Sequence, residues 1–132
     1  VATFIDYDNI YVTLKEDFIT DNFEFDTLPA HFRRISSSIG RVNYAKAYAN
    51  WMNRGAGIMQ AFGANLINVT HVFPKKNGKD RSDASIIVDA MELLYTKKNI
   101  SHFVFHAEIP VFPFAGRVVR EYVDPGESFQ GG

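Results

Sequence analysis

Short runs of apolar residues alternate with longer amphipathic stretches along the chain, and each apolar run ends at polar residues. Such runs are typical of buried parallel strands. The predicted strands are Val1–Ile5, Arg41–Ala49, Asn65–Val72 and His102–His106. The remaining stretches predict helices over Ile10–Phe18, Asp26–Ile39, Asn53–Phe62, from Ser82 to the Lys97–Lys98 pair, and over Phe112–Tyr122. Asp26 is expected to cap its helix and Gly40 to end it, and Gly63 is expected to end the next helix.

The alternation of strands and helices favours an α/β fold in three layers, with a central parallel sheet between helices. We expect the strand that ends at Ile5 and the strand His102–His106 to be neighbours at its centre, because both are short, apolar and followed by polar residues. Ligands of such sheets bind beyond the carboxyl ends of the strands. That rule directs attention to Asp6, to the polar loop Pro74–Arg81 and to the residues after Phe105.

Length and composition fit a single globular domain, with 132 residues of which 46% are hydrophobic and 22% charged. A net charge of −1 excludes a chain that is basic throughout, so any nucleic acid must bind at a local patch. The absence of cysteine excludes disulfides and thiolate zinc sites, and favours Mg²⁺ or Mn²⁺ held by oxygen ligands. No run has the length of a membrane span and no signal peptide is visible, so we expect a cytoplasmic protein. Because Val1 already lies in an apolar run, we expect the chain to be an excised domain.

The first candidate site follows the first strand, where Asp6, Asp8 and Asn9 leave its end together. Carboxylate and amide oxygens at such short spacing suit a hard divalent cation. Asp6 is expected to face the ligand crevice, because strand-end acids in this class usually do. For Asp8 a metal site and a helix cap are equally good interpretations, and Asn9 is a further candidate for the cap.

A second group of acids lies on the helix that begins at Ser82. Asp83 lies in its first turn, where the helix dipole alone would favour a carboxylate. Asp89 lies among apolar residues, where a carboxylate is costly unless it is paired, hydrogen-bonded or bound to metal. The alternative is that Asp89 belongs to a polar stripe with Ser85 or Glu92.

The loop before this helix is locally basic, with Lys75, Lys76, Lys79 and Arg81. A phosphate backbone needs such a rim beside a divalent cation, although a solvated loop explains the cluster equally well. Trp51 and Arg54 follow the second strand and could stack on a base. A core position is nevertheless the more common one for a tryptophan.

Four groups of residues stand out in this order along the chain: Phe4–Tyr11, Ala47–Trp51, Gly78–Asp83 with Ile86–Leu93, and His102–Phe105. They resemble, in turn, the opening motif, the second strand, the central helix and the strand before an acidic loop of NYN domains of the LabA-like kind. One such motif would be weak, but several in the right order make the resemblance specific. We therefore expect an NYN/PIN-like domain over residues 1–123 and an irregular tail over 124–132 that is truncated or a cloning remnant.

The resemblance implies a PIN-like fold and metal-dependent cleavage of RNA. The acids of the family carry over to Asp6, Asp8, Asp83 and Asp89. Members typically continue after the fourth strand with Ser-Gly-Asp-Ser-Asp-Phe, whereas this chain reads Ala107–Phe112. Both aspartates of that motif are absent, and Glu108 is the nearby acid that could replace them. The family's fifth strand is expected to be cut short, because the tail from Asp124 has no apolar run.

The leading hypothesis is a metal-dependent ribonuclease that cleaves phosphodiester bonds of RNA, with single-stranded RNA as the expected partner. Its expected catalytic residues are Asp6, Asp83 and Asp89. The expected ligands of Mg²⁺ or Mn²⁺ are Asp6, Asp8, Asp83 and Glu108. The expected RNA contacts are Asn9, Lys75, Lys79 and Arg81. The alternative is a catalytically impaired RNA-binding or scaffold module, because Ile109 and Val111 stand where the family has aspartates. A homodimer and additional domains in the full-length protein stay open.

Overall fold

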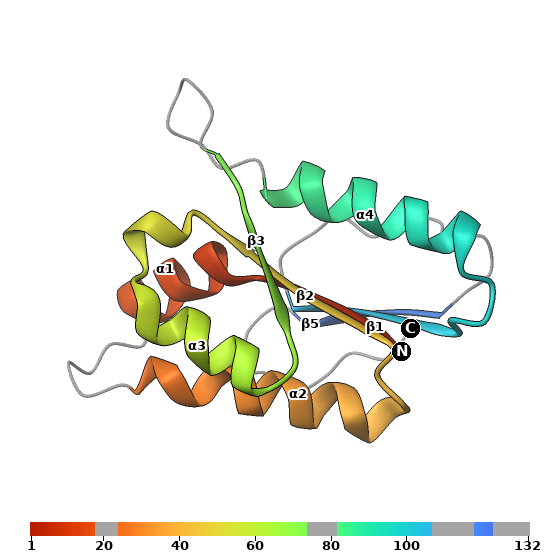
Figure 1. The fold of residues 1–132 in the computed structure, drawn as a ribbon, viewed down its shortest axis with the longest axis horizontal. Coiled ribbons are helices and arrows are strands. Elements are labelled where there is room, and N and C mark those ends of the chain that lie inside the picture. Colours follow the sequence, from red (N-terminus) through yellow and green to blue (C-terminus); the bar gives the residue numbers. More distant parts are fainter. Residues whose placement is uncertain (18–23, 74–81, 107–117, 123–132) are drawn as a thin grey trace.

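The computed structural model describes residues 1–17, 24–73, 82–106 and 118–122, arranged as in Figure 1. The strands are β1 (Ala2–Asp6), β2 (Tyr44–Ala49), β3 (Asn68–His71), β4 (His102–His106) and β5 (Val118–Tyr122). The α-helices are α1 (Tyr7–Asp17), α2 (Leu28–Ile39), α3 (Ala56–Ala64) and α4 (Ser82–Thr96). Two short 3-10 helices, η1 (Phe25–Thr27) and η2 (Trp51–Asn53), precede α2 and α3. Strands and helices therefore alternate along the chain as predicted.

The described strands form one parallel sheet in the order β3-β2-β1-β4-β5. β1 lies between β2 and β4, so the predicted adjacency of the first strand and His102–His106 is confirmed. Helices α1, α2 and α3 cover one face of the sheet, and α4 covers the other (Figure 1). The predicted three-layer α/β fold with a central parallel sheet is confirmed.

Each face of the sheet carries its own hydrophobic core, because successive strand residues point to opposite faces. Phe4 of β1 packs under α4, where its ring centroid lies 6.1 Å from that of Phe103 and 5.3 Å from that of Phe105. The next residue, Ile5, packs in the core on the side of α1, α2 and α3. Burial on both faces explains why the strands are nearly continuous apolar runs. By the same alternation Asp6 lies on the face of Phe4, beneath α4.

The last part of the described chain differs from the prediction. We predicted a helix over Phe112–Tyr122 and a fifth strand that is cut short, but Val118–Tyr122 forms β5. β5 pairs in parallel with β4 along its whole length, from His102 opposite Val118 to His106 opposite Tyr122. The β-branched pair Val118-Val119 favours a strand, and pairing with the edge of β4 satisfies the backbone groups of both segments. The rest of the predicted helix lies outside the described residues.

Several boundaries also differ from the prediction. α1 begins at Tyr7, directly after β1 and so earlier than predicted. Asp26 lies in η1 and does not cap α2, whose N-cap position is occupied by Thr27. Gly40 ends α2 as predicted, whereas α3 continues through Gly63. An internal glycine costs a helix only about 1 kcal/mol, which the packing of α3 offsets. None of the described helices is long and apolar enough to cross a membrane.

Candidate active site at the carboxyl edge of the sheet

Asp6 ends β1 at the centre of the sheet, and α1 starts at the next residue. The residue is almost fully buried, with 1% of its surface exposed. The backbone N–H of Asn9 donates a long hydrogen bond, 3.4 Å, to Asp6 Oδ1. The dipole of α1 adds positive potential on this side of the carboxylate. A carboxylate buried this deeply needs donors or positive charge around it, and a divalent cation at this edge would add positive charge.

The first turn of α4 lies near the same edge. Figure 1 shows the N-terminal end of α4 at the same end of the molecule as the carboxyl ends of β1 and β2. Asp83 is the second residue of α4, so the backbone brings it to the end and the face of the sheet where Asp6 lies. The described part of the structure does not include Lys75, Lys79, Arg81, Glu108 or the side chain of Asp83. Convergence of Asp6 and Asp83 on one cation therefore stays a prediction.

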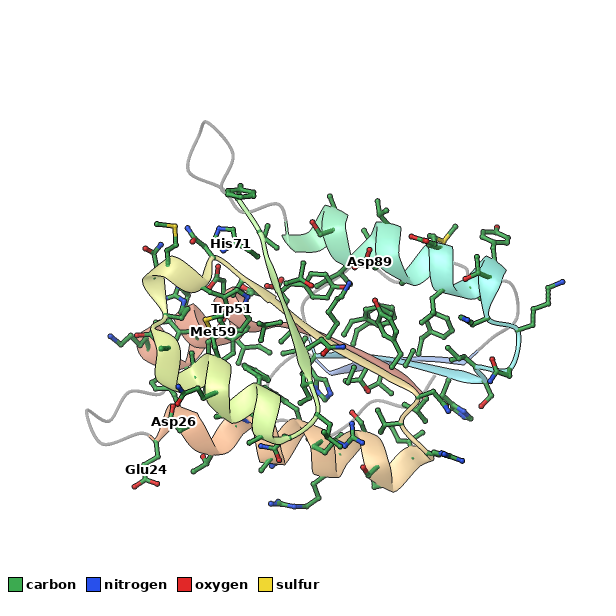
Figure 2. The ribbon with its side chains drawn as sticks, viewed as in Figure 1. Glu24, Asp26, Trp51, Met59, His71 and Asp89 are labelled. Atoms are coloured by element: carbon green, nitrogen blue, oxygen red, sulfur yellow. The ribbon has the colours of Figure 1, made fainter. Side chains whose placement is uncertain are left out.

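Asp89 is paired with two residues of β2, across the boundary between α4 and the sheet. The hydroxyl of Tyr48 donates to Asp89 Oδ2 at 2.6 Å, and Lys46 Nζ contacts the same oxygen at 3.1 Å. Tyr48 lies opposite Asp6 in the register of β1 and β2. The carboxylate therefore faces the sheet (Figure 2) and is not part of a solvated stripe on the outer surface of α4. Pairing makes it tolerable among apolar neighbours.

The surroundings of this network keep Lys46 charged and Tyr48 neutral. Burial alone would lower the pKa of Lys46, but Tyr44 and Asp89 outweigh it and raise that pKa above its usual 10.5. Burial, reinforced by the hydrogen bond to Asp89, raises the pKa of Tyr48 far above its usual range. Tyr48 thus keeps its proton and donates a hydrogen bond to Asp89, and the three side chains together fix α4 on β2.

Asp8 ties the first turn of α1 to the segment that follows β2. Asp8 Oδ2 accepts the backbone N–H of Asn50 at 2.7 Å, and Asp8 Oδ1 accepts Arg54 Nε at 2.7 Å. Both side chains are nearly buried, Asp8 at 5% and Arg54 at 14% exposure. The guanidinium carbon of Arg54 also lies 4.0 Å from the centre of the Tyr11 ring. Both oxygens of Asp8 already accept hydrogen bonds, and its role as a metal ligand stays a prediction.

Trp51 occupies the core rather than a ligand surface. It is 5% exposed, its ring stacks on Tyr7 with centroids 5.6 Å apart, and its indole N–H donates to the carbonyl of Thr70 at 2.9 Å. The core interpretation of Trp51 is confirmed, and its burial excludes stacking on a base. Arg54 is likewise engaged with Asp8. Any aromatic contact with a nucleobase must come from another residue.

Asn50, directly after β2, offers an oxygen at the same edge. Its Oδ1 is buried and accepts no hydrogen bond from any residue that the structure describes. Within the described ranges, no group of three or more histidine, aspartate or glutamate side chains is placed to hold a metal. The donors present are oxygens, a carboxylate from Asp6 and an amide from Asn50, and oxygen donors suit Mg²⁺ or Mn²⁺. The chemistry of the edge therefore fits a hard cation, and Asp83 and Glu108 stay predicted ligands.

His106, the last residue of β4, is a structural residue inside the core. It is fully buried, its Nε2 lies 3.4 Å from Ser36 Oγ, and that oxygen accepts the hydroxyl of Thr3 at 2.8 Å. The ring of Phe32 packs against it with centroids 4.8 Å apart. Burial, with a smaller contribution from His31, lowers the pKa of His106 to about 3. The imidazole is therefore neutral at physiological pH and joins β1, α2 and β4.

Acidification should destabilise the protein through His106. Its pKa is lowered from 6.5 in the folded state, so the unfolded chain binds the proton first and stability falls as pH drops from 6.5 towards 3. Between pH 7.5 and 5.5 the loss should be about 1 kcal/mol, measured by urea unfolding. His106→Gln should remove this loss, whereas His102→Gln, at the half-buried start of β4, should retain it. An equal loss in the wild type and His106→Gln would contradict the assignment.

The sequence did not single out three residues on or just after β2, namely Lys46, Tyr48 and Asn50. A lysine between alanines and tyrosines in a predicted buried strand is a signal that could have found Lys46, because a charge there needs a partner. Tyr48 and Asn50 carry no such signal. Their roles depend on Asp89 and Asp8, which lie 41 and 42 positions away in the sequence.

Comparison with known proteins adds one finding to this geometry. The family model of the NYN domain matches residues 1–122, which include every described strand and helix. Neither the comparison with curated proteins nor that with solved structures gave a match. The matched range contains Asp6, at the end of the central strand, and helix α4. The LabA-like subtype stays a prediction. The chain belongs to the NYN domain family.

Proposed function

We propose that the protein is a metal-dependent ribonuclease that cleaves phosphodiester bonds of single-stranded RNA. The observation that carries the proposal is the placement of Asp6. It is a buried carboxylate at the carboxyl end of the central strand, on the face and at the end of the sheet where α4 begins. α4 carries Asp83 in its first turn. Ligands of open parallel sheets bind at this edge, and membership of the NYN family supports a nuclease there.

Asp6 and Asp83 would hold Mg²⁺ or Mn²⁺, with Glu108 as a third ligand in place of the lost aspartates. When bound, the cation would polarise the scissile phosphate and activate water. Lys75, Lys79 and Arg81 would hold the phosphate backbone, with Asn9 beside them. The N-terminal ends of α1 and α4 add positive potential on the side where a phosphate would approach.

Asp89 would contribute through its contacts with the sheet. Its carboxylate is held by Lys46 and Tyr48 of β2, and Tyr48 is opposite Asp6. These bonds fix how far along the sheet α4 lies, and therefore where Asp83 lies relative to Asp6. Asp89 is thus proposed as a positioning residue of the catalytic set.

Incubation of the purified domain with end-labelled single-stranded RNA tests the proposal. Cleavage should require Mn²⁺ or Mg²⁺, stop with EDTA, and be lost in Asp6→Asn. Asp26→Asn is the matched control, because Asp26 is an exposed aspartate in η1, on the opposite side of the sheet from Asp89 (Figure 2). Cleavage that continues unchanged in EDTA, or in Asp6→Asn, would refute the proposed mechanism.

The alternative function is a catalytically impaired RNA-binding or scaffold module. Ile109 and Val111, where the family typically has aspartates, favour it. In the same experiment this module would bind the RNA and leave it intact at every metal concentration. If the wild type binds the RNA without cleaving it, the ribonuclease proposal is wrong and the binding-module proposal takes its place.

A further inference from the structure

An aromatic pair is exposed where the edge strand β3 ends. Phe73 is 70% exposed, whereas Phe4, Phe32 and other phenylalanines of the described core are fully buried. The ring of Phe73 lies against that of His71, with centroids 4.6 Å apart and planes at 69°. An edge-to-face contact of this kind restricts the rotation of the exposed ring and leaves much of its surface to solvent. The pair therefore offers an exposed aromatic ring, that of Phe73, which is held by its contact with His71.

The backbone that carries this pair is held in place by β2 and by α4. Val72, the residue between His71 and Phe73 in the sequence, belongs to the same core cluster as Ile86 and Ala90 of α4. Its N–H donates to the carbonyl of Ala49 at 2.9 Å, which continues the pairing with β2 beyond the last residue of β3. His71 lies at the carboxyl edge of the sheet, near the N-terminal end of α4 (Figure 2). The exposed ring thus lies at the carboxyl edge of the sheet, after β3 and two strands away from Asp6.

Basic residues follow the pair in the sequence, and their charge suits the phosphates of a nucleic acid strand. The residues that follow in the sequence include Lys75, Lys79 and Arg81. Sites for single-stranded nucleic acids combine cations that hold the phosphates with aromatic rings on which bases stack, because every base has an apolar face. Trp51 and Arg54, the stacking residues that the sequence suggested, are engaged inside the protein. Phe73 is the described aromatic residue that is free to take this role at the edge.

We propose that Phe73, supported by His71, is a stacking site for an unpaired base of the RNA strand that enters the active site. The inference rests on the proposed function and adds a contact with the base to a substrate site otherwise built for phosphate. A stacking site of this kind would favour single-stranded RNA, since a base within a duplex has no free face.

Binding of a short single-stranded RNA that carries 2-aminopurine tests the proposal, with Mg²⁺ replaced by Ca²⁺ to limit cleavage. The wild type should quench the fluorescence of 2-aminopurine, which reports stacking. Phe73→Ala should abolish the quenching and weaken binding roughly tenfold, whereas Phe73→Tyr should behave like the wild type. Met52→Ala is the control, because Met52 is 85% exposed and has no ring. All variants should melt like the wild type, since the replaced side chains are on the surface.

Salt dependence separates stacking from phosphate binding. Phe73→Ala should keep the wild-type slope of log affinity against log salt. Replacing Lys75, Lys79 and Arg81 together by alanine should flatten that slope by about one unit for each phosphate that the loop no longer binds. An abasic oligonucleotide should bind the wild type as weakly as the intact RNA binds Phe73→Ala.

Three results would overturn the inference and can be told apart. If the wild type binds or cleaves RNA and Phe73→Ala binds as tightly, the stacking site is wrong while the proposed function stands. If the wild type neither binds nor cleaves RNA, both fall, and the exposed pair is a contact surface for another protein. Quenching that survives in Phe73→Ala would also refute the assignment.

Discussion

Replacing Asp6 by asparagine should abolish most of the rise in melting temperature that Mn²⁺ or Mg²⁺ causes in the wild type. A ligand that binds only the folded state stabilises it by mass action, and loss of a carboxylate ligand removes that linkage. RNA cleavage should fall by about a hundredfold or more, because even the loss of a partner of a metal ligand typically costs 10–100-fold. Differential scanning fluorimetry against metal concentration, together with the cleavage rate, measures both effects.

The same substitution should raise the melting temperature of the metal-free protein. Asp6 is 1% exposed and is expected to lie near Asp83, so its charge is both desolvated and repelled when no cation is present. Asp83→Asn is the informative comparison. A metal ligand at Asp83 predicts the same pattern as at Asp6, whereas a residue that only favours the helix start predicts a small loss of stability and an unchanged metal effect.

Glu108 decides whether the lost aspartates have been replaced. If Glu108 is the third ligand, Glu108→Gln should reduce the affinity for Mn²⁺ as Asp6→Asn does. Isothermal titration calorimetry of the wild type at millimolar Mn²⁺ sets the baseline. No heat of binding there would mean that the metal site disappeared together with the motif, and the binding-module alternative would then hold.

Replacing Arg54 by methionine should destabilise the fold by about 3 kcal/mol, because the carboxylate of Asp8 would stay buried without its cation. Asp8 is 5% exposed and would keep only the backbone N–H of Asn50 as a described donor. In a domain of this size the expected fall in melting temperature is about 10 °C. The Asp8→Asn, Arg54→Met double variant should recover much of the loss, since no uncompensated charge remains. Urea unfolding of the wild type, both single variants and the double variant measures the coupling.

The more exposed pair of Lys46 and Asp89 is the matched control for this cycle. Its side chains are 25% and 26% exposed, so solvent screens the charges and Lys46→Met should cost about 1 kcal/mol. Metal adds a second test. If Asp8 also binds a cation, Mn²⁺ should restore part of the stability of Arg54→Met. Equal costs for the two pairs, or an additive double variant, would contradict a buried ion pair that locks α1 to the segment after β2.

The layers of the fold could be predicted from the sequence because a strand that is buried on both faces appears in the sequence as a short apolar run. Val1–Ile5 and His102–His106 are short apolar runs that end in polar residues, and they are the neighbouring strands β1 and β4. The same pattern located Asp6 at the end of a central strand. β5 was missed because an edge strand has weaker apolar patterning, and its assignment depends on pairing with β4.

The partners of the acids were beyond prediction from the sequence for a different reason. Asp8 and Asp89 stand two residues and six residues after Asp6 and Asp83, and local spacing makes all four equivalent candidates. Their partners lie more than forty residues away, on or after β2. Only the packed chain shows that Asp8 is bound to Arg54 and Asp89 to Lys46 and Tyr48.

The central place of β1 also affects how the protein folds while it is being synthesised on the ribosome. Among the described elements β1 emerges before the others, and the strands and helices up to β3 can bury the core around Ile5 while the rest is still being synthesised. The other edge of β1 stays open until β4 emerges, because Ala2 pairs with Phe103. α4, with Asp83, also emerges late. If the protein is the proposed ribonuclease and Asp6 and Asp83 act together, a nascent chain has no complete cleavage site until its second half has folded.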